Sequence, residues 1–207
     1  MKTNNVFILT MIILVLYSCK QEVKEIDPVA LPEPQTGMTL SESNQLLSDY
    51  YQEVINHTVG RKLPDIRISD SHGKQFQLRE LISKKNLILI SDAFCSFGAE
   101  GLSNDYPKAL QKIREEHPEL EFDVFCLLVK PQNDEEYPER FRRLAEEVEP
   151  HFPDYYIISE EQARSINYLG GPTRYFVNKE GIVTNMGAGI SLIEGRIFRV
   201  LLQNLRD

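Results

Sequence analysis

Residues 87–98 read Leu-Ile-Leu-Ile-Ser-Asp-Ala-Phe-Cys-Ser-Phe-Gly, and this stretch decides the fold. Its four consecutive apolar residues, Leu87 to Ile90, are typical of a strand that is covered on both faces of a sheet. Cys95 follows the end of that strand, where α/β proteins place ligand-binding and catalytic residues. A helical period of apolar residues comes next. The stretch therefore predicts a buried strand, then a cysteine, then a helix.

The start of that helix has two alternatives. Leu102 and Tyr106 are in helical phase, which favours a helix from about residue 99 with a kink at Pro107. A helix that starts only at Asp105, with the proline in its first turn, fits the same residues. Only the first alternative places Cys95 near a helix N-terminus, where backbone N–H groups and the helix dipole lower the pKa of a thiol.

Outward from this stretch, strands and helices alternate along the chain. Further strands are expected at 66–68, 76–78, 122–129, 155–158, 175–177 and 182–183. Further helices are expected at 41–55, 81–82, 141–148 and 192–205. This order predicts an α/β fold, a mixed sheet with helices on both faces, preceded by an N-terminal helical extension.

The segment before the strand at 175–177 reads Gly170-Gly171-Pro172-Thr173. Together with the opening phrase Gly60-Arg61-Lys62-Leu63-Pro64-Asp65 and the buried strand into Phe94-Cys95, it resembles the thioredoxin superfamily. The resemblance is to the membrane-anchored redoxins, which include the thiol–disulfide oxidoreductases of cytochrome maturation. It covers residues 60–207 and implies a thioredoxin-like domain there.

The resemblance also implies a site. Cys95 takes the place of the attacking cysteine of the family's Cys-x-x-Cys motif, and Pro172 that of the cis-proline that faces it. The residue before that proline, here Gly171, offers its backbone to an extended substrate chain. The substrate-binding residues are then expected to be Phe94, Gly171, Pro172 and Thr173, and no cofactor or metal is expected.

The second cysteine of the motif is missing, because Gly98 stands in its place. Without it, Cys95 can form a mixed disulfide but cannot release it internally. Cys126 lies within an apolar strand and is expected to be an inert core residue, not a partner of Cys95. Ile88 and Asp92 stand where a peroxiredoxin has Pro and Thr or Ser, which disfavours a peroxidase. A nearby Asp92 would raise the pKa of the Cys95 thiol.

The first residues are interpreted as a targeting segment. Lys2 precedes an apolar run that is too short for a permanent membrane span of about 20 residues. The run ends in Leu16-Tyr17-Ser18-Cys19, which resembles the cleavage box of bacterial lipoproteins and implies lipidation at Cys19. We therefore expect a signal peptide at 1–18, a flexible tether at 19–40, a helical extension at 41–59 and the domain at 60–207. A lipid anchor implies a protein of the bacterial cell envelope, on the periplasmic side or in the outer membrane.

Composition excludes several classes of function. The chain carries 23 Lys and Arg against 31 Asp and Glu, a net charge of −8, which disfavours nucleic acid as a partner. Three cysteines are too few for a disulfide scaffold and lack zinc-site spacing. The four histidines are scattered and are expected to be structural.

Two hypotheses on function remain. In the first, the protein is a thiol–disulfide redox protein in which Cys95 alone reacts with thiols or disulfides of exported proteins and an external thiol reductant completes the turnover. In the second, the redoxin is degenerate and the fold serves as a binding or scaffold module. A lone cysteine in an oxidising compartment is a liability unless it is used, which favours the first.

Overall fold

The computed structural model describes residues 23–33, 37–82, 84–93, 96–130, 137–189 and 195–206. Three residues that the sequence singled out, Cys19, Phe94 and Cys95, lie outside these ranges. The expected signal peptide also lies outside them.

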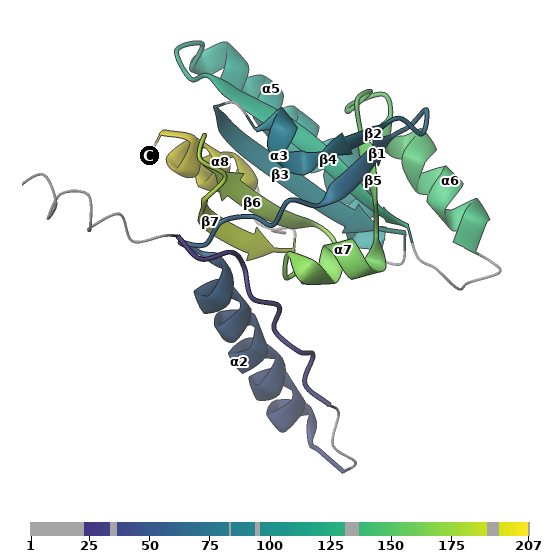
Figure 1. The fold of residues 1–207 in the computed structure, drawn as a ribbon, viewed down its shortest axis with the longest axis vertical. Helices are drawn as coiled ribbons and strands as arrows, with labels where there is room; N and C mark the ends of the chain where they lie inside the picture. Colours follow the sequence, from purple (N-terminus) through teal and green to yellow (C-terminus); the bar gives the residue numbers. More distant parts are fainter. Residues whose placement is uncertain are drawn as a thin grey trace, which may run out of the picture.

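A single mixed sheet of seven strands forms the centre of the domain (Figure 1). Its strands are β1 (Arg67–Asp70), β2 (Gln75–Gln77), β3 (Lys85–Asp92), β4 (Phe122–Lys130), β5 (Tyr156–Ser159), β6 (Thr173–Val177) and β7 (Val183–Ala188). Their order across the sheet is β2-β1-β5-β4-β3-β6-β7. The central pairs β3–β4 and β4–β5 are parallel, and the outer pairs on both sides are antiparallel.

Helices cover both faces of the sheet. One face packs against residues of α2 (Leu40–Thr58), α3 (Leu78–Leu81) and α7 (Glu160–Ser165). The other packs against η1 (Gly101–Asp105), α5 (Tyr106–Glu116), α6 (Tyr137–Val148) and α8 (Arg196–Arg206), and α4 (Ser96–Glu100) precedes η1. The α/β fold expected from the sequence, with its N-terminal helix, is confirmed.

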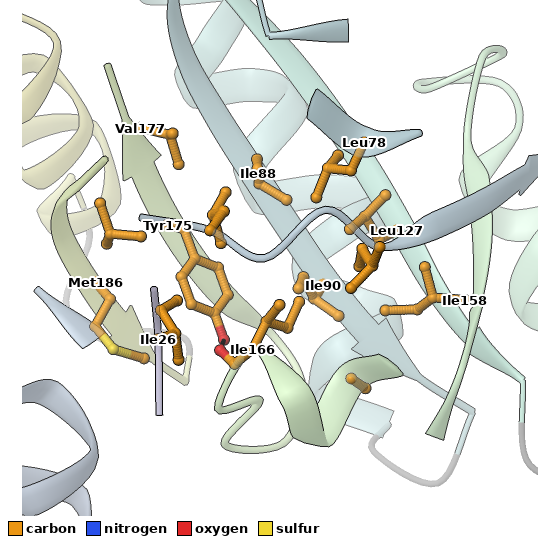
Figure 2. Close-up of a cluster of buried hydrophobic side chains, with 14 of the residues drawn as sticks. Ile26, Leu78, Ile88, Ile90, Leu127, Ile158, Ile166, Tyr175, Val177 and Met186 are labelled. Carbon is orange, nitrogen blue, oxygen red and sulfur yellow. Dashed lines mark hydrogen bonds between the residues drawn. The ribbon is translucent and has the colours of Figure 1, made fainter. Parts of the chain in front are cut away.

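The continuous apolar run of β3 is buried because each face of the strand meets a different layer. Ile88 and Ile90 point into the core beside α3 and α7, where Figure 2 shows them near Leu127 and Tyr175. Leu87 and Leu89 point into the opposite core, beneath α5 and α8. All four are at most 1% exposed, so β3 lies at the centre of the molecule and fixes the position of whatever follows it.

The helix after β3 begins at Ser96 and runs without a break to Glu116. Its middle, residues 101–105, is π-helical: the Tyr106 N–H donates to the carbonyl of Gly101, five residues back. Pro107 has no backbone N–H to donate within the helix, and the π turn beside it accommodates the missing hydrogen bond. Of the two alternatives left open by the sequence, the helix that starts before Asp105 is therefore correct, and it begins at Ser96, the residue after Cys95 in the sequence.

The segment that was expected to belong to a flexible tether contacts the domain instead. Ile26 is 6% exposed within the core, and its N–H donates to the carbonyl of Lys62 at 2.9 Å. The buried Asn167 side chain accepts a hydrogen bond from Val29 N–H (2.8 Å) and donates to the Asp27 carbonyl (3.2 Å). The tether prediction is therefore wrong for residues 24–29, because composition alone did not reveal these long-range partners. Figure 1 shows α2 projecting from the domain beside this segment.

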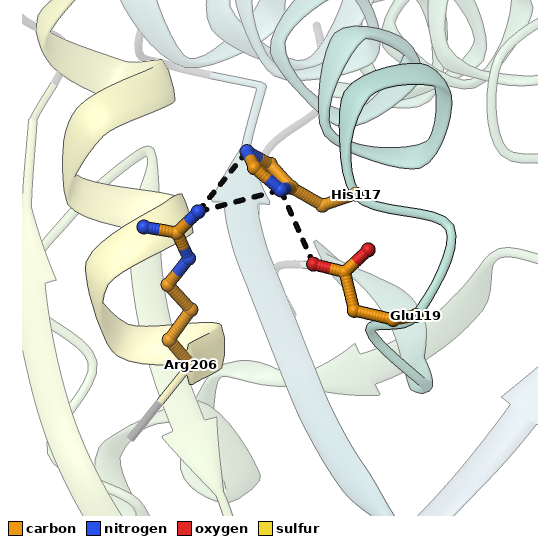
Figure 3. A network of polar contacts seen from close by, with 3 residues as sticks. All are labelled: His117, Glu119 and Arg206. Atoms are coloured by element: carbon orange, nitrogen blue, oxygen red, sulfur yellow. Dashed lines mark hydrogen bonds and ion pairs between the residues drawn. The ribbon is translucent and has the colours of Figure 1, made fainter.

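The C-terminal helix is tied to the end of α5 by a polar contact. An Arg206 Nη2 lies 3.3 Å from both ring nitrogens of His117, and His117 Nδ1 lies 3.3 Å from a Glu119 carboxylate oxygen (Figure 3). His117 therefore has a structural contact, as the sequence predicted for the histidines.

Candidate functional site

The loop before β6 contains the cis-proline that the resemblance implies. The Gly171–Pro172 peptide bond is cis. The Pro172 carbonyl accepts a hydrogen bond from Gly189 N–H at 2.9 Å, which holds the loop against the end of β7. Gly171 is half-buried and Pro172 is buried. The loop therefore presents Gly171 at its surface.

The Thr173 side chain forms hydrogen bonds within the cis-proline loop. Its side chain is fully buried, its hydroxyl donates to the Gly170 carbonyl at 2.6 Å, and the same oxygen accepts from Leu169 N–H at 3.3 Å. Both hydrogen bonds hold Leu169 and Gly170, which precede the cis peptide bond. The Thr173 side chain thus shapes the loop, whereas the sequence predicted it as a substrate-binding residue.

The first turn of α4 packs directly on this loop through Gly98. A Cβ built on Gly98 would lie 3.3 Å from the Gly171 Cα and would overlap the Ser91 hydroxyl. A Cβ on Gly171 would overlap the same hydroxyl and would lie 3.3 Å from the Ser91 Cβ. Ser91, which is fully buried at the end of β3, therefore fills the space between two glycines that approach closely.

Asp92 is held on the other side of the loop. The Tyr168 hydroxyl donates to an Asp92 carboxylate oxygen at 2.7 Å, and it also lies near Gly171, 3.3 Å from the position a Cβ would take there. From the sequence, a nearby Asp92 was expected to oppose activation of the thiol and had no other role in the site. In the structure its carboxylate has a hydroxyl donor and forms part of the site's wall.

A groove of about 620 Å³ runs along the cis-proline loop, between it and the projecting helix α2. Helix α2 contributes Tyr51, which is 40% exposed, and Ile55. The remaining lining residues come from the end of β3, the loop and the end of β7: Asp92, Leu169, Gly170, Gly171, Ala188 and Gly189. The N-terminal helix therefore forms one wall of the candidate site, which no motif in the sequence indicated.

Cys126 is a core residue, as the sequence predicted. It is 1% exposed in the middle of β4 and pairs in register with Leu89. Burial raises the pKa of its thiol well above the usual value, so the thiolate that reacts in redox chemistry is disfavoured there.

Among the residues that the structure describes, no three His, Cys, Asp or Glu side chains lie close enough together to hold a metal ion. None of the helices placed in the structure combines the length and the apolar character that a membrane span requires.

Neither a protein-family model nor a curated protein sequence matches the chain. Solved structures do match its fold. The thioredoxin domain of a thiol–disulfide oxidoreductase from Bacteroides vulgatus is 16% identical, with a TM-score of 0.51, covering 72% of this chain and 98% of that one. ScoI from Arabidopsis thaliana with copper bound is 17% identical, with a TM-score of 0.50, covering 68% of this chain and 96% of that one.

The architecture is thus an α/β domain in which a cis-proline loop lies against the start of a helix that follows the central strand. This architecture is the thioredoxin-like fold. Thiol–disulfide oxidoreductases are among the solved structures that share it. The sequence predicted Gly171 and Pro172 as site residues and noted Gly98, but it gave no role to Ser91 or Tyr168. A small polar residue at the end of an otherwise apolar strand was the one signal for Ser91.

Proposed function

We propose that the protein is a thiol–disulfide redox protein of the bacterial cell envelope that acts through Cys95. The observation that carries the proposal is the contact of Gly98 with Gly171, because it brings the first turn of α4 onto the cis-proline loop. Cys95 directly precedes that helix in the sequence. The order of strand, cysteine, helix and cis-proline loop is the one that the resemblance to membrane-anchored redoxins implies.

The reaction follows from a single thiol. The Cys95 thiolate attacks one sulfur of a disulfide in an exported client protein, a mixed disulfide forms, and the other client sulfur leaves as a thiolate. An external thiolate then attacks the Cys95 sulfur and releases the second client thiolate. A second external thiol reduces the resulting disulfide on Cys95. In sum, one client disulfide and two external thiols give one client dithiol and one external disulfide.

The groove between α2 and the cis-proline loop supplies the place for the client. Gly171 lies along it with its backbone at the surface of the loop, and Tyr51 and Ile55 give the opposite wall an apolar surface. An extended client segment with apolar side chains fits a groove of this chemistry. Lipidation at Cys19, proposed from the Leu16–Cys19 box, would hold this groove near the envelope where exported clients pass.

A second candidate function uses the same groove without chemistry. Gly98 in place of a second cysteine, with the space beside it filled by Ser91, favours a degenerate redoxin that binds exported proteins non-covalently. The two candidates differ only in whether the Cys95 thiol reacts.

The deciding experiment traps the intermediate. The full chain is expressed in a bacterium, thiols are blocked with N-ethylmaleimide at lysis, and membrane proteins are separated without reductant. Redox function predicts mixed disulfides that disappear in Cys95→Ser and persist in Cys126→Val, the matched control, because Cys126 is buried. The pH dependence of alkylation should give Cys95 a pKa below the reference of about 8.5. A higher pKa, with no Cys95-dependent adduct, would support the binding module instead.

A further inference from the structure

Arg174 is a charged residue inside the buried strand β6. It stands between Thr173 and Tyr175, which are both fully buried, and is itself half-buried on the α5 and α8 face of the sheet. Its Nη1 donates to the Tyr106 hydroxyl at 3.4 Å and to the Gly189 carbonyl at 3.2 Å. No carboxylate among the described residues pairs with it, and these residues supply no partner for its Nε or Nη2.

The neighbouring strand is built to hold this side chain in place. Gly187 is the register partner of Arg174 on β7, and a Cβ on Gly187 would lie 2.6 Å from the Arg174 Nη2 and 3.0 Å from its Cζ. Glycine weakens a strand and often marks a position where another group must approach closely. Here the close group is the Arg174 guanidinium, which occupies space that a side chain at residue 187 would need.

The guanidinium faces a cavity of about 150 Å³. A second cation, Arg196, lines the same cavity at the first position of α8, a helix with no acidic residue in its first turn. The first N–H groups of a helix have no intrahelical acceptors and favour negative charge. Ala188 and Gly189 line both this cavity and the groove along the cis-proline loop, so the two spaces adjoin.

A half-buried guanidinium without an acidic partner is unfavourable unless something else neutralises it. The chain as a whole is acidic, with a net charge of −8. At this cavity the described residues place two arginines, a tyrosine hydroxyl and a helix start, and no carboxylate. The free edge of a guanidinium, Nε with Nη2, matches the two oxygens of a carboxylate or a phosphate.

From this geometry we propose that the cavity binds a small oxyanion, of the carboxylate or phosphate type, with Arg174 as its main ligand and Arg196 in support. The anion occupies the edge of the guanidinium that Tyr106 and Gly189 leave open. This proposal does not depend on thiol chemistry.

The test titrates the full chain, as Cys95→Ser to exclude redox side reactions, with sodium acetate and with inorganic phosphate at low ionic strength. Isothermal calorimetry should show saturable binding of at least one probe, weakened by added chloride. We expect Arg174→Gln to weaken it about tenfold or more and Arg196→Gln about threefold, since only Arg174 offers a preorganised pair of donors. The probe that binds more tightly, acetate or phosphate, identifies the kind of oxyanion.

Two further variants serve as controls for this titration. Gly187→Ala keeps every charge but displaces the guanidinium, so it should weaken binding about as much as Arg174→Gln does. It tests the proposal independently if Arg174→Gln folds poorly. Arg199→Gln removes an exposed charge from the same helix without touching the cavity lining and should bind as the parent does. Equal binding by the Arg174→Gln, Gly187→Ala and Arg199→Gln variants overturns the proposal.

Discussion

Gly98 and Gly171 pack closely against each other: a Cβ on Gly98 would lie 3.3 Å from the Gly171 Cα. The resemblance described above implies that Gly98 takes the place of the second cysteine of a Cys-x-x-Cys motif. In this chain the Ser91 hydroxyl occupies the space that a side chain there would need. The missing cysteine and the serine are therefore one structural feature, in which three residues fit together.

This fit predicts the stability of alanine variants. Gly98→Ala should lower the free energy of unfolding by about 1–3 kcal/mol, because its methyl group overlaps the Ser91 hydroxyl. In a Ser91→Ala background the same change should cost less, because only the 3.3 Å contact with the Gly171 Cα remains and alanine is the better helix former by about 1 kcal/mol. Urea unfolding of the four proteins of this cycle measures the coupling.

Gly171→Ala serves as the comparison. Its methyl group would also lie 3.3 Å from both the Ser91 Cβ, which alanine retains, and the Tyr168 hydroxyl, and a loop position gains nothing from helix propensity. Ser91→Ala should therefore rescue it less well than it rescues Gly98→Ala. If Gly98→Ala is as stable as the parent protein with Ser91 intact, the three-residue fit is not what excludes a side chain at position 98.

A second prediction restores the missing thiol. The double variant Ser91→Ala/Gly98→Cys should form a disulfide between residues 95 and 98 and release client proteins that the parent retains, because an internal thiol now attacks the mixed disulfide. Mass spectrometry of the alkylated, unreduced protein detects the loss of two hydrogens. Ser91→Ala/Gly98→Ala has similar packing without the thiol and should still trap clients. Equal trapping by both double variants would contradict the proposed role of Cys95.

A third prediction concerns the segment before α2. Asn167 is 4% exposed, has a φ of 60°, and bonds through its side chain to Val29, Asp27 and Thr58. Asn167→Ala should cost about 2 kcal/mol, since it leaves buried polar groups unpaired and places alanine at a positive φ. Hydrogen exchange at the Val29 amide should accelerate. Asn167→Gly relieves the backbone strain but not the lost bonds, so fast exchange should persist there while part of the stability returns. Unchanged protection of Val29 would show that other contacts hold the segment.

Much of the fold was predictable because its signals are local. The apolar run of β3, the hairpin of β1 and β2 and the periodicity of α5 and α8 are properties of neighbouring residues, and all four appear as expected. Helix α7 was missed because it has only six residues, although Ser159 and Gln162 form a capping box at its start. The anchoring of Ile26 was missed because its hydrogen-bond partner, Lys62, lies 36 residues away in the sequence.

The candidate site likewise contains residues that local motifs predicted and residues that only long-range contacts bring together. Pro172 and Gly171 were found through a motif, and the structure places them in the loop that the resemblance implied. The wall formed by Tyr51 and Ile55, and the space filled by Ser91, arise only when distant segments meet. Arg174 carried a signal that was not used, since a charged residue within the apolar strand Thr-Arg-Tyr-Phe-Val requires a partner.

The buried thiol of Cys126 predicts how stability changes with pH. In the unfolded chain this thiol ionises near pH 8.5, whereas burial raises its pKa in the native state. Above about pH 8.5 the unfolded state therefore releases a proton that the native state keeps, and stability falls as the pH rises. Cys126→Val should match the parent to within about 1.5 kcal/mol at pH 7, because the two side chains are similar in size. By pH 10 it should have gained about 2 kcal/mol relative to the parent, at about 1.36 kcal/mol per pH unit. Urea unfolding under reductant, from pH 7 to pH 10, measures the difference. The buried tyrosines and Cys95 are common to both proteins, so their titration cancels. Parallel stability curves would mean that the native Cys126 thiol ionises as readily as it does in the unfolded chain.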